Sequence, residues 1–184
     1  MQNFELKILS QHWIKDDGVY DKNDICSHGE LFLKIGGEVL SDSASGSWSL
    51  STAALFLLRT LDRDCQINDF TNYLIPCCGH TMMFLEKGDE FATTLGCIHG
   101  IDWTVKHKDG MVELTTERGN KTSLPFDFYK NKILDFVNEV EAFYGDPNEK
   151  TPYEKNKNNN DGYETPAVFA AFWREWRFLK QKWA

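Results

Sequence analysis

An unbroken apolar stretch limits what this chain can fold into. Within GSWSLSTAALFLLRTLDR, six consecutive apolar residues run from Ala53 to Leu58, and no polar face appears before Arg59 and Thr60. A helix that is apolar all round is buried on most sides, and alanine and leucine favour helix over strand. Residues 50–61 are too few to span a bilayer, which takes about 20. The run therefore predicts a buried central helix, started by a hydroxyl cap from Ser49, Ser51 or Thr52.

Two further helices are expected near the C-terminus. Residues 127–144 carry one apolar face, and Gly145 with Pro147 marks where that helix ends. A final helix starts at Thr165-Pro166, a pair typical of a helix start, and its apolar stripe is expected to dock on the body. The apolar face of the first helix consists of Tyr129, Ile133, Phe136, Val137, Val140 and Tyr144. That of the final helix consists of Phe169, Phe172, Trp173, Trp176, Leu179 and Trp183.

Alternation of apolar and polar residues indicates β-structure on both sides of the central helix. Residues 4–9 and 31–35 are expected to form strands, with a turn or bulge at Gly36-Gly37. Residues 73–116 predict an antiparallel meander of about four strands, with turns at 87–89 and at Asp109-Gly110, the strongest hairpin signal of the chain. Residues 15–30 are expected to form a polar loop.

These elements predict an α+β fold, in which an antiparallel sheet (a meander) packs around a buried central helix, with two C-terminal helices. We expect a single domain over residues 1–184. Within it, residues 1–145 form the α+β body, residues 146–164 a mobile loop low in apolar content, and residues 165–184 a C-terminal helix docked on the body.

The charge balance narrows the class of partner. The net charge is −8 and the isoelectric point about 5.1. An acidic surface repels phosphate backbones and anionic lipid, so nucleic acid and membranes are not expected as partners, whereas a basic protein would be attracted. The odd number of cysteines does not resemble a secreted disulfide framework, and the first residues lack a leader pattern. We therefore expect a cytoplasmic protein.

One cluster offers metal or thiol chemistry. Cys77, Cys78, His80, Cys97 and His99 could converge if their segments pair, and thiolates and imidazoles are zinc ligands. Alternatively, one thiol could act as a nucleophile, with a histidine as base and Asp102 orienting it. The spacing matches no known finger or ribbon, and buried cysteine also packs as a small hydrophobe. We expect packing, with no cofactor and no catalytic residue, and keep a metal- or thiol-dependent enzyme or zinc-stabilised module as the alternative.

The final helix also carries an excess of positive charge, with Arg174, Arg177, Lys180 and Lys182 against Glu175. With its tryptophans, such a helix could bind nucleic acid or a membrane surface. Aromatic stripes at helical spacing are more often core. We therefore expect the aromatic side chains to face the core and the cations to meet the acidic body.

Four segments together resemble a known class of proteins. GSWSLSTAALFLLRTL, LIPCCGH, GCIHGIDWTV and FWREW are similar in style to small cytoplasmic immunity proteins of bacterial toxin systems, including contact-dependent growth inhibition and other polymorphic toxin loci. The resemblance implies an antitoxin-like inhibitor that binds a cognate toxin domain from a neighbouring cell and has no reaction of its own. Because such proteins differ in fold, it carries over no functional residue.

The acidic loop supplies the candidate binding residues. Many toxins of this kind are nucleases and therefore basic, so a chain of charge −8 would be steered toward one. We expect a partner-facing rim with exposed aromatic anchors. An equally good explanation is a merely solubilising face. The candidates are Trp13, Asp16, Asp17, Tyr20, Asp21 and Asp24.

Overall fold

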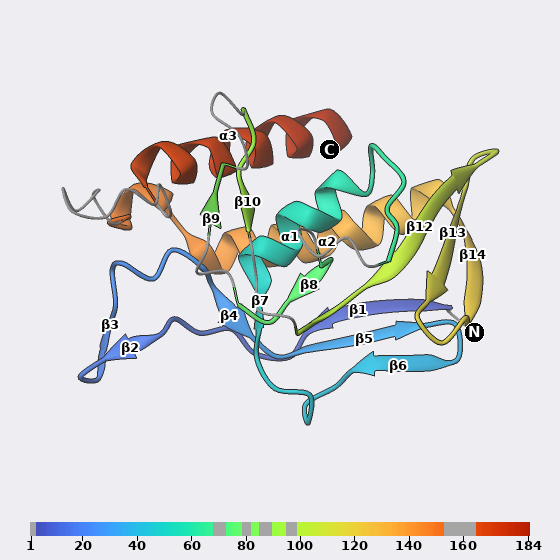
Figure 1. Ribbon diagram of the computed structural model, residues 1–184, viewed down its shortest axis with the longest axis horizontal. Helices are drawn as coiled ribbons and strands as arrows, with labels where there is room; N and C mark the ends of the chain where they lie inside the picture. Colours follow the sequence, from blue (N-terminus) through green and yellow to red (C-terminus); the bar gives the residue numbers. More distant parts are fainter. Residues whose placement is uncertain (1–2, 68–72, 79–81, 85–89, 95–98, 153–164) are drawn as a thin grey trace.

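Helix α1 (Leu50–Arg59) lies at the centre of the molecule (Figure 1). The computed structural model describes residues 3–67, 73–78, 82–84, 90–94, 99–152 and 165–184. All ten residues of α1 are buried, and helices α2 (Phe126–Tyr144) and α3 (Pro166–Trp183) as well as short strands pack against it. The helix ends where the Thr60 hydroxyl donates to the carbonyl of Leu57. The predicted buried central helix is therefore confirmed.

The start of α1 differs from the expected hydroxyl cap. Ser49 occupies the cap position, but its side chain accepts no backbone amide and instead donates to the Thr52 hydroxyl. The backbone of Ser27 takes over this role: its carbonyl accepts the amide of Leu50, at 2.8 Å, and its amide donates to the Ser51 hydroxyl, at 3.1 Å. A neighbouring segment thus satisfies the helix start, which a local sequence pattern cannot reveal.

A first antiparallel sheet covers one side of the core. Its order is β1–β5–β6, formed by β1 (Phe4–Ile8), β5 (Leu31–Ile35) and β6 (Glu38–Ser41). The predicted turn between β5 and β6 is present, and Gly36 adopts a φ of +61° that suits glycine. Alternate residues of β1 and β5 point into the core, and helix α2 packs against β1.

A second sheet is the regular meander of the fold. It consists of β12 (Trp103–Lys108), β13 (Met111–Thr116) and β14 (Lys121–Pro125), in that order. The Asp109-Gly110 turn is confirmed, with φ values of 51° and 75°. The register places Val105 opposite Leu114 and His107 opposite Val112. Strand β14 was not predicted, because Lys121–Pro125 is too polar to stand out.

The short strands of residues 73–101 pair as the two arms of the expected antiparallel hairpin. Strand β8 (Ile75–Pro76) pairs with β11 (Gly100–Ile101), and β9 (Met82–Met83) pairs with β10 (Thr93–Thr94). Both pairs follow one register, in which Ile75 lies opposite Ile101 and Met83 opposite Thr93, as expected for the two arms of a single hairpin. The predicted turn at 87–89 lies outside the described residues.

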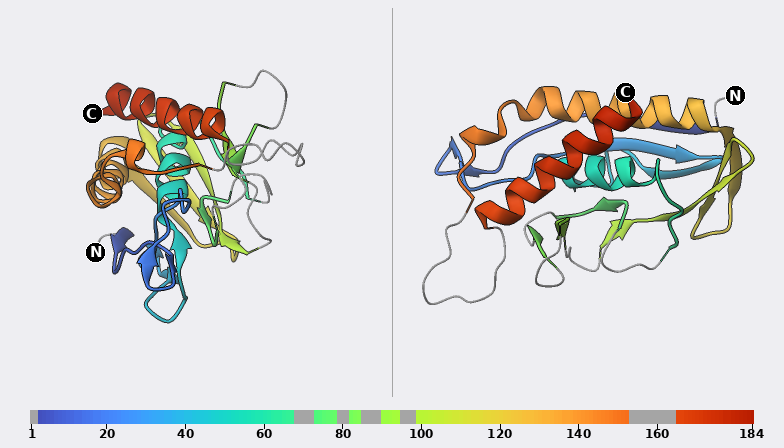
Figure 2. Two further views of the ribbon diagram at one scale, coloured as in Figure 1. Left: turned by 90° about the vertical axis from the view of Figure 1, so that its left-hand side faces the viewer. Right: turned by 90° about the horizontal axis from the view of Figure 1, so that it is seen from above.

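The two C-terminal helices form as predicted and pack across the core (Figure 2). Helix α2 (Phe126–Tyr144) buries the six residues of its predicted face and ends at Gly145, with φ +73°. Helix α3 (Pro166–Trp183) is capped by the Thr165 hydroxyl and packs on α1 and α2. Its aromatic stripe faces the core, with Trp183 half-buried. No helix among the described residues is both long and apolar enough to cross a membrane.

Short strands interrupt the predicted loop over residues 15–30. It contains a hairpin of β2 (Lys15–Asp16) and β3 (Val19–Tyr20), followed by β4 (His28–Gly29), which pairs with β7 (Trp48–Ser49). Within the predicted mobile loop, Pro147–Glu149 forms a short 3-10 helix, η1. Residues 153–164 of that loop lie outside the part of the chain that the structure describes.

Candidate functional site

The β2–β3 hairpin projects from one end of the molecule (Figure 1). Asp17 and Gly18 form its tip with φ values of 47° and 81°, the left-handed pair that a tight two-residue hairpin requires. Val19 is 71% exposed and Tyr20 58% exposed, and Ile14 at the start of the hairpin is also exposed. The Lys15 ammonium lies 5.0 Å from the centre of the Tyr20 ring. The hairpin thus presents apolar and aromatic surface to solvent.

The base of the hairpin is fixed by a buried carboxylate. Asp24 is only 4% exposed, and its oxygens accept the amides of Ile14, at 2.8 Å, and of Cys26, at 3.3 Å. The Nε2 atom of His28 lies 3.1 Å from the same carboxylate. Burial on its own would raise the pKa of Asp24, but the hydrogen bonds from His28 and the two amides lower that pKa below its ordinary value. Asp24 is therefore a structural anchor, and the expectation that it lies on an exposed rim is wrong.

Trp13 is also part of the base rather than an exposed anchor. Its half-buried ring stacks on Phe143, with centroids 5.6 Å apart, and meets Tyr144 edge-on at 4.8 Å. The Lys150 ammonium lies 3.1 Å from the centre of the Trp13 ring. Burial lowers the pKa of Lys150. Because Thr151 donates to the carbonyl of Lys22, the segment after α2 is tied to the hairpin.

The other acidic candidates of the predicted binding rim differ in how exposed they are. Asp17 is exposed at the tip, and Asp21 is half-buried with its carboxylate accepting the amide of Asn23, at 2.8 Å. Asp16 belongs to β2, but its side chain lies outside the described part of the structure. Acidic residues outnumber basic ones four to two in residues 15–24 and two to one in residues 146–150. This end of the molecule therefore combines exposed apolar residues with a negative charge balance.

The cysteine and histidine segments are partly brought together. The pairing of β8 with β11 places the Cys77 amide 3.2 Å from the carbonyl of His99. Cys77 is disulfide-bonded, so it is neither the packing thiol that we expected nor a thiolate available to a metal. Cys78 is half-buried and His99 exposed. His80 and Cys97 lie outside the described residues, and among those described no three His, Cys, Asp or Glu side chains form a metal-binding group.

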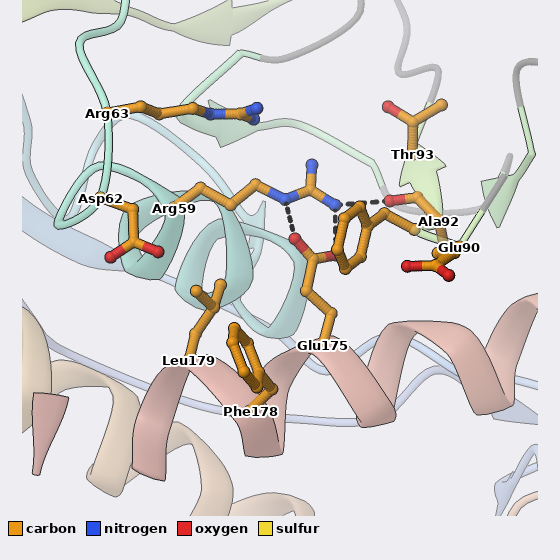
Figure 3. Close-up of a pocket in the computed structure, with 10 residues that line it drawn as sticks. Arg59, Asp62, Arg63, Glu90, Ala92, Thr93, Glu175, Phe178 and Leu179 are labelled. Carbon is orange, nitrogen blue, oxygen red and sulfur yellow. Dashed lines mark hydrogen bonds and ion pairs between the residues drawn. The ribbon is translucent and has the colours of Figure 1, made fainter. Parts of the chain in front are cut away.

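A pocket of about 400 Å³ opens between the end of α1 and helix α3 (Figure 3). On its floor, Arg59 donates from Nε and Nη2 to the two carboxylate oxygens of Glu175, at 2.8 and 2.7 Å, and from Nη2 to the carbonyl of Ala92, at 2.6 Å. Two aromatic side chains stand beside it, Phe91 at 52% and Phe178 at 60% exposed. The lining residues are Arg59, Asp62, Arg63, Glu90, Phe91, Ala92, Thr93, Glu175, Phe178 and Leu179.

Sequence reasoning did not select this pocket, although two signals exist. Arg59 directly follows the apolar run from Ala53 to Leu58. Because that run is buried, the Arg59 side chain starts from a buried backbone position. Phe178 lies off the aromatic stripe of the last helix, between the buried Trp176 and Leu179. A single exposed aromatic residue is ordinary, but Phe178 and Phe91 together expose apolar surface beside one pocket, which makes this surface a candidate for contact with another molecule.

Comparisons with protein-family models, with curated proteins and with solved structures found no match to this chain.

Proposed function

We propose that this protein is an immunity protein that binds and neutralises a cognate toxin domain of basic, nuclease type. The binding surface in this proposal is the acidic end that carries the β2–β3 hairpin. The observation that carries it is the exposure of Val19 and Tyr20 on a projecting hairpin. Exposed aromatic residues with aliphatic neighbours are the usual anchors of protein interfaces.

The fixed base of the hairpin supports the proposal. Asp24 holds the backbone on both sides of the hairpin, through the amides of Ile14 and Cys26, and Trp13 packs against the end of α2. A surface that is already ordered loses less conformational entropy on binding than a flexible loop. The hairpin can therefore present Tyr20 in one position to a partner.

The electrostatic balance supports a basic partner. The chain carries a net charge of −8, and acidic residues outnumber basic ones around the hairpin. Complementary charge accelerates encounter and excludes partners of like charge more than it adds affinity. A nuclease, which must hold phosphates, presents the positive surface that such a protein would attract.

The experiment expresses this chain together with the product of the neighbouring gene, and measures co-purification and protection of growth. A Val19→Asp, Tyr20→Ala double variant should weaken binding by about 2 kcal/mol or more, the scale of a lost anchor. Val39→Asp places the same charge at an exposed valine of β6 and should leave binding unchanged. A neighbouring gene that encodes no toxin, together with absence of protection, would overturn the proposal.

A further inference from the structure

The chain that leaves α2 passes the base of the β2–β3 hairpin (Figure 2). Two consecutive residues of this chain contact the two ends of the hairpin. The Lys150 ammonium lies 3.1 Å from the centre of the ring of Trp13, which precedes the hairpin. The Thr151 amide donates to the carbonyl of Lys22, which follows the hairpin, at 2.9 Å. Lys150 and Thr151 therefore form a bridge between the chain that enters the hairpin and the chain that leaves it.

The bridge is tied to the end of α2. The Asp146 side chain caps η1, and the Lys150 amide donates to the carbonyl of Pro147, at 3.2 Å, so the segment between α2 and the bridge is a closed helical turn. The Trp13 ring stacks on Phe143 in the last turn of α2. Trp13 thus contacts both the end of α2 and the bridge.

The charge of Lys150 contributes to this contact. A tryptophan ring attracts a cation over its face, and the attraction is larger where water is excluded. Burial disfavours the ammonium and lowers the pKa of Lys150, while the negative charges of Asp24 and Asp21 act in the opposite direction. A neutral side chain of similar length would lose the attraction of the ring and of the two carboxylates.

We infer that Lys150 is a positioning residue of the hairpin surface, whose ammonium holds the bridge on the hairpin base and thereby fixes where Val19 and Tyr20 stand. Lys150 is not an anchor itself, because its ammonium lies against Trp13 and not at the exposed tip. The inference rests on the proposed function only in taking the hairpin as the partner-binding surface. The bridge is a property of the unbound chain and can be tested there.

A bridge of this kind sets the fraction of molecules whose hairpin is ready to bind. The apparent affinity falls in proportion to that fraction. Loss of the bridge should therefore slow association and leave dissociation unchanged, whereas loss of the Tyr20 anchor should speed dissociation. Removal of the Lys150 charge also makes this end more acidic, which by itself would speed association with a basic partner. Slower association in a neutral variant therefore cannot come from the change in net charge.

The first experiment follows hydrogen–deuterium exchange in the free full chain. In Lys150→Met, the hydrogen-bonded amides of Ile14 and Asp21 at the hairpin base should exchange about tenfold faster, the scale of a lost cation–π contact. The amides of α1 should keep the parent rate. Lys150→Arg retains a cation and should restore slow exchange. Lys22→Met removes the same charge from an exposed lysine at the same end and should exchange as the parent chain does.

Three results of this experiment would overturn the inference. One is unchanged exchange of the Ile14 and Asp21 amides in Lys150→Met. Another is an equal rise in α1, which would indicate a general loss of stability, since those amides report global unfolding. The third is an equally large rise in Lys150→Arg, because the charge would then have no part in the contact.

The second experiment measures association and dissociation of the toxin by stopped flow. Slower association with unchanged dissociation in Lys150→Met supports the inference. Faster dissociation would overturn it, because Lys150 would then contact the partner directly. If the Ile14 and Asp21 amides exchange faster but both rates of binding stay unchanged, Lys150 still positions the hairpin, and the assignment of the hairpin as the binding surface is wrong instead.

Discussion

At the scale of single residues, the buried Arg59–Glu175 pair shows how a charge is kept at the end of an apolar helix. Both side chains are nearly covered, and two parallel hydrogen bonds join them. The carbonyl of Ala92 accepts a further hydrogen bond from the guanidinium. A buried pair of this kind adds little net stability over an apolar pair, but loss of one partner leaves a charge without compensation.

Glu175→Leu should therefore lower the free energy of unfolding by about 3–5 kcal/mol, because Arg59 stays buried with its charge uncompensated. Denaturant unfolding measures this change. Lys130→Gln removes the largely solvent-screened Lys130–Asp127 pair and should cost less than about 1 kcal/mol. A comparable loss in both variants would contradict the distinction between the two pairs.

Asp24 gives a prediction about acid stability. Because its folded-state pKa is lowered, its stabilisation is fully present above the unfolded-state pKa of about 4 and disappears as the pH falls through the lowered value. Asp24→Asn should reduce stability at pH 7 and flatten the decline below about pH 4. Unfolding curves at pH 7 and at about pH 3 measure both effects. If Asp24→Asn loses as much stability between pH 7 and about pH 3 as the parent chain does, Asp24 does not have this role.

At the scale of elements, sequence patterns predicted the long structures and missed the short ones. The apolar face of α2 was predicted in full, because six side chains repeat at helical spacing. The β2–β3 hairpin was missed although Asp17-Gly18 is the same signal that predicted Asp109-Gly110. Its strands have two residues each and face solvent, so no alternation marks them. The base of the candidate site was missed for another reason: the partners of Asp24 and Trp13 lie elsewhere in the chain.

The β12–β13 turn allows a test of conformational strain alone. A methyl group at Gly110 would contact nothing within 4 Å, yet the φ of +75° disfavours any side chain. Gly110→Ala should therefore cost about 1–2 kcal/mol. Gly37→Ala also places its methyl group in open space, and Gly37 has no positive φ, so its effect should be near zero. Equal stability of the two variants would exclude strain as the cause.

At the scale of the whole molecule, the predicted α+β architecture around a central helix is confirmed, and so is the antiparallel pairing of the segments on the two sides of residues 87–89. The pairing of β4 with β7 was not predictable, because it joins distant segments of two residues each, which contain too little pattern to specify a partner. The function remains a proposal that follows from charge and exposed surface.

The charge distribution leads to a prediction about binding kinetics. Asp17→Lys combined with Asp21→Lys should slow association with a basic toxin, and Asp127→Lys combined with Asp135→Lys on α2 should have a smaller effect. For the parent chain, association should slow as ionic strength rises to about 0.15 M, where the Debye length is about 8 Å. Stopped-flow measurements give both rates. Identical rates for the two variants would remove the hairpin from the encounter surface.

The complete burial of α1 has a consequence for how the molecule opens. Its backbone amides are enclosed by other elements on every side, so deuterium can replace their hydrogens only through global unfolding. The solvent-exposed amides at the tip of the hairpin, in contrast, can exchange through small openings that leave its anchored base in place. Exchange rates along the chain should therefore span a gradient, slowest in the innermost helix and fastest at the protruding tip, which lets a partner protect the tip without altering the interior.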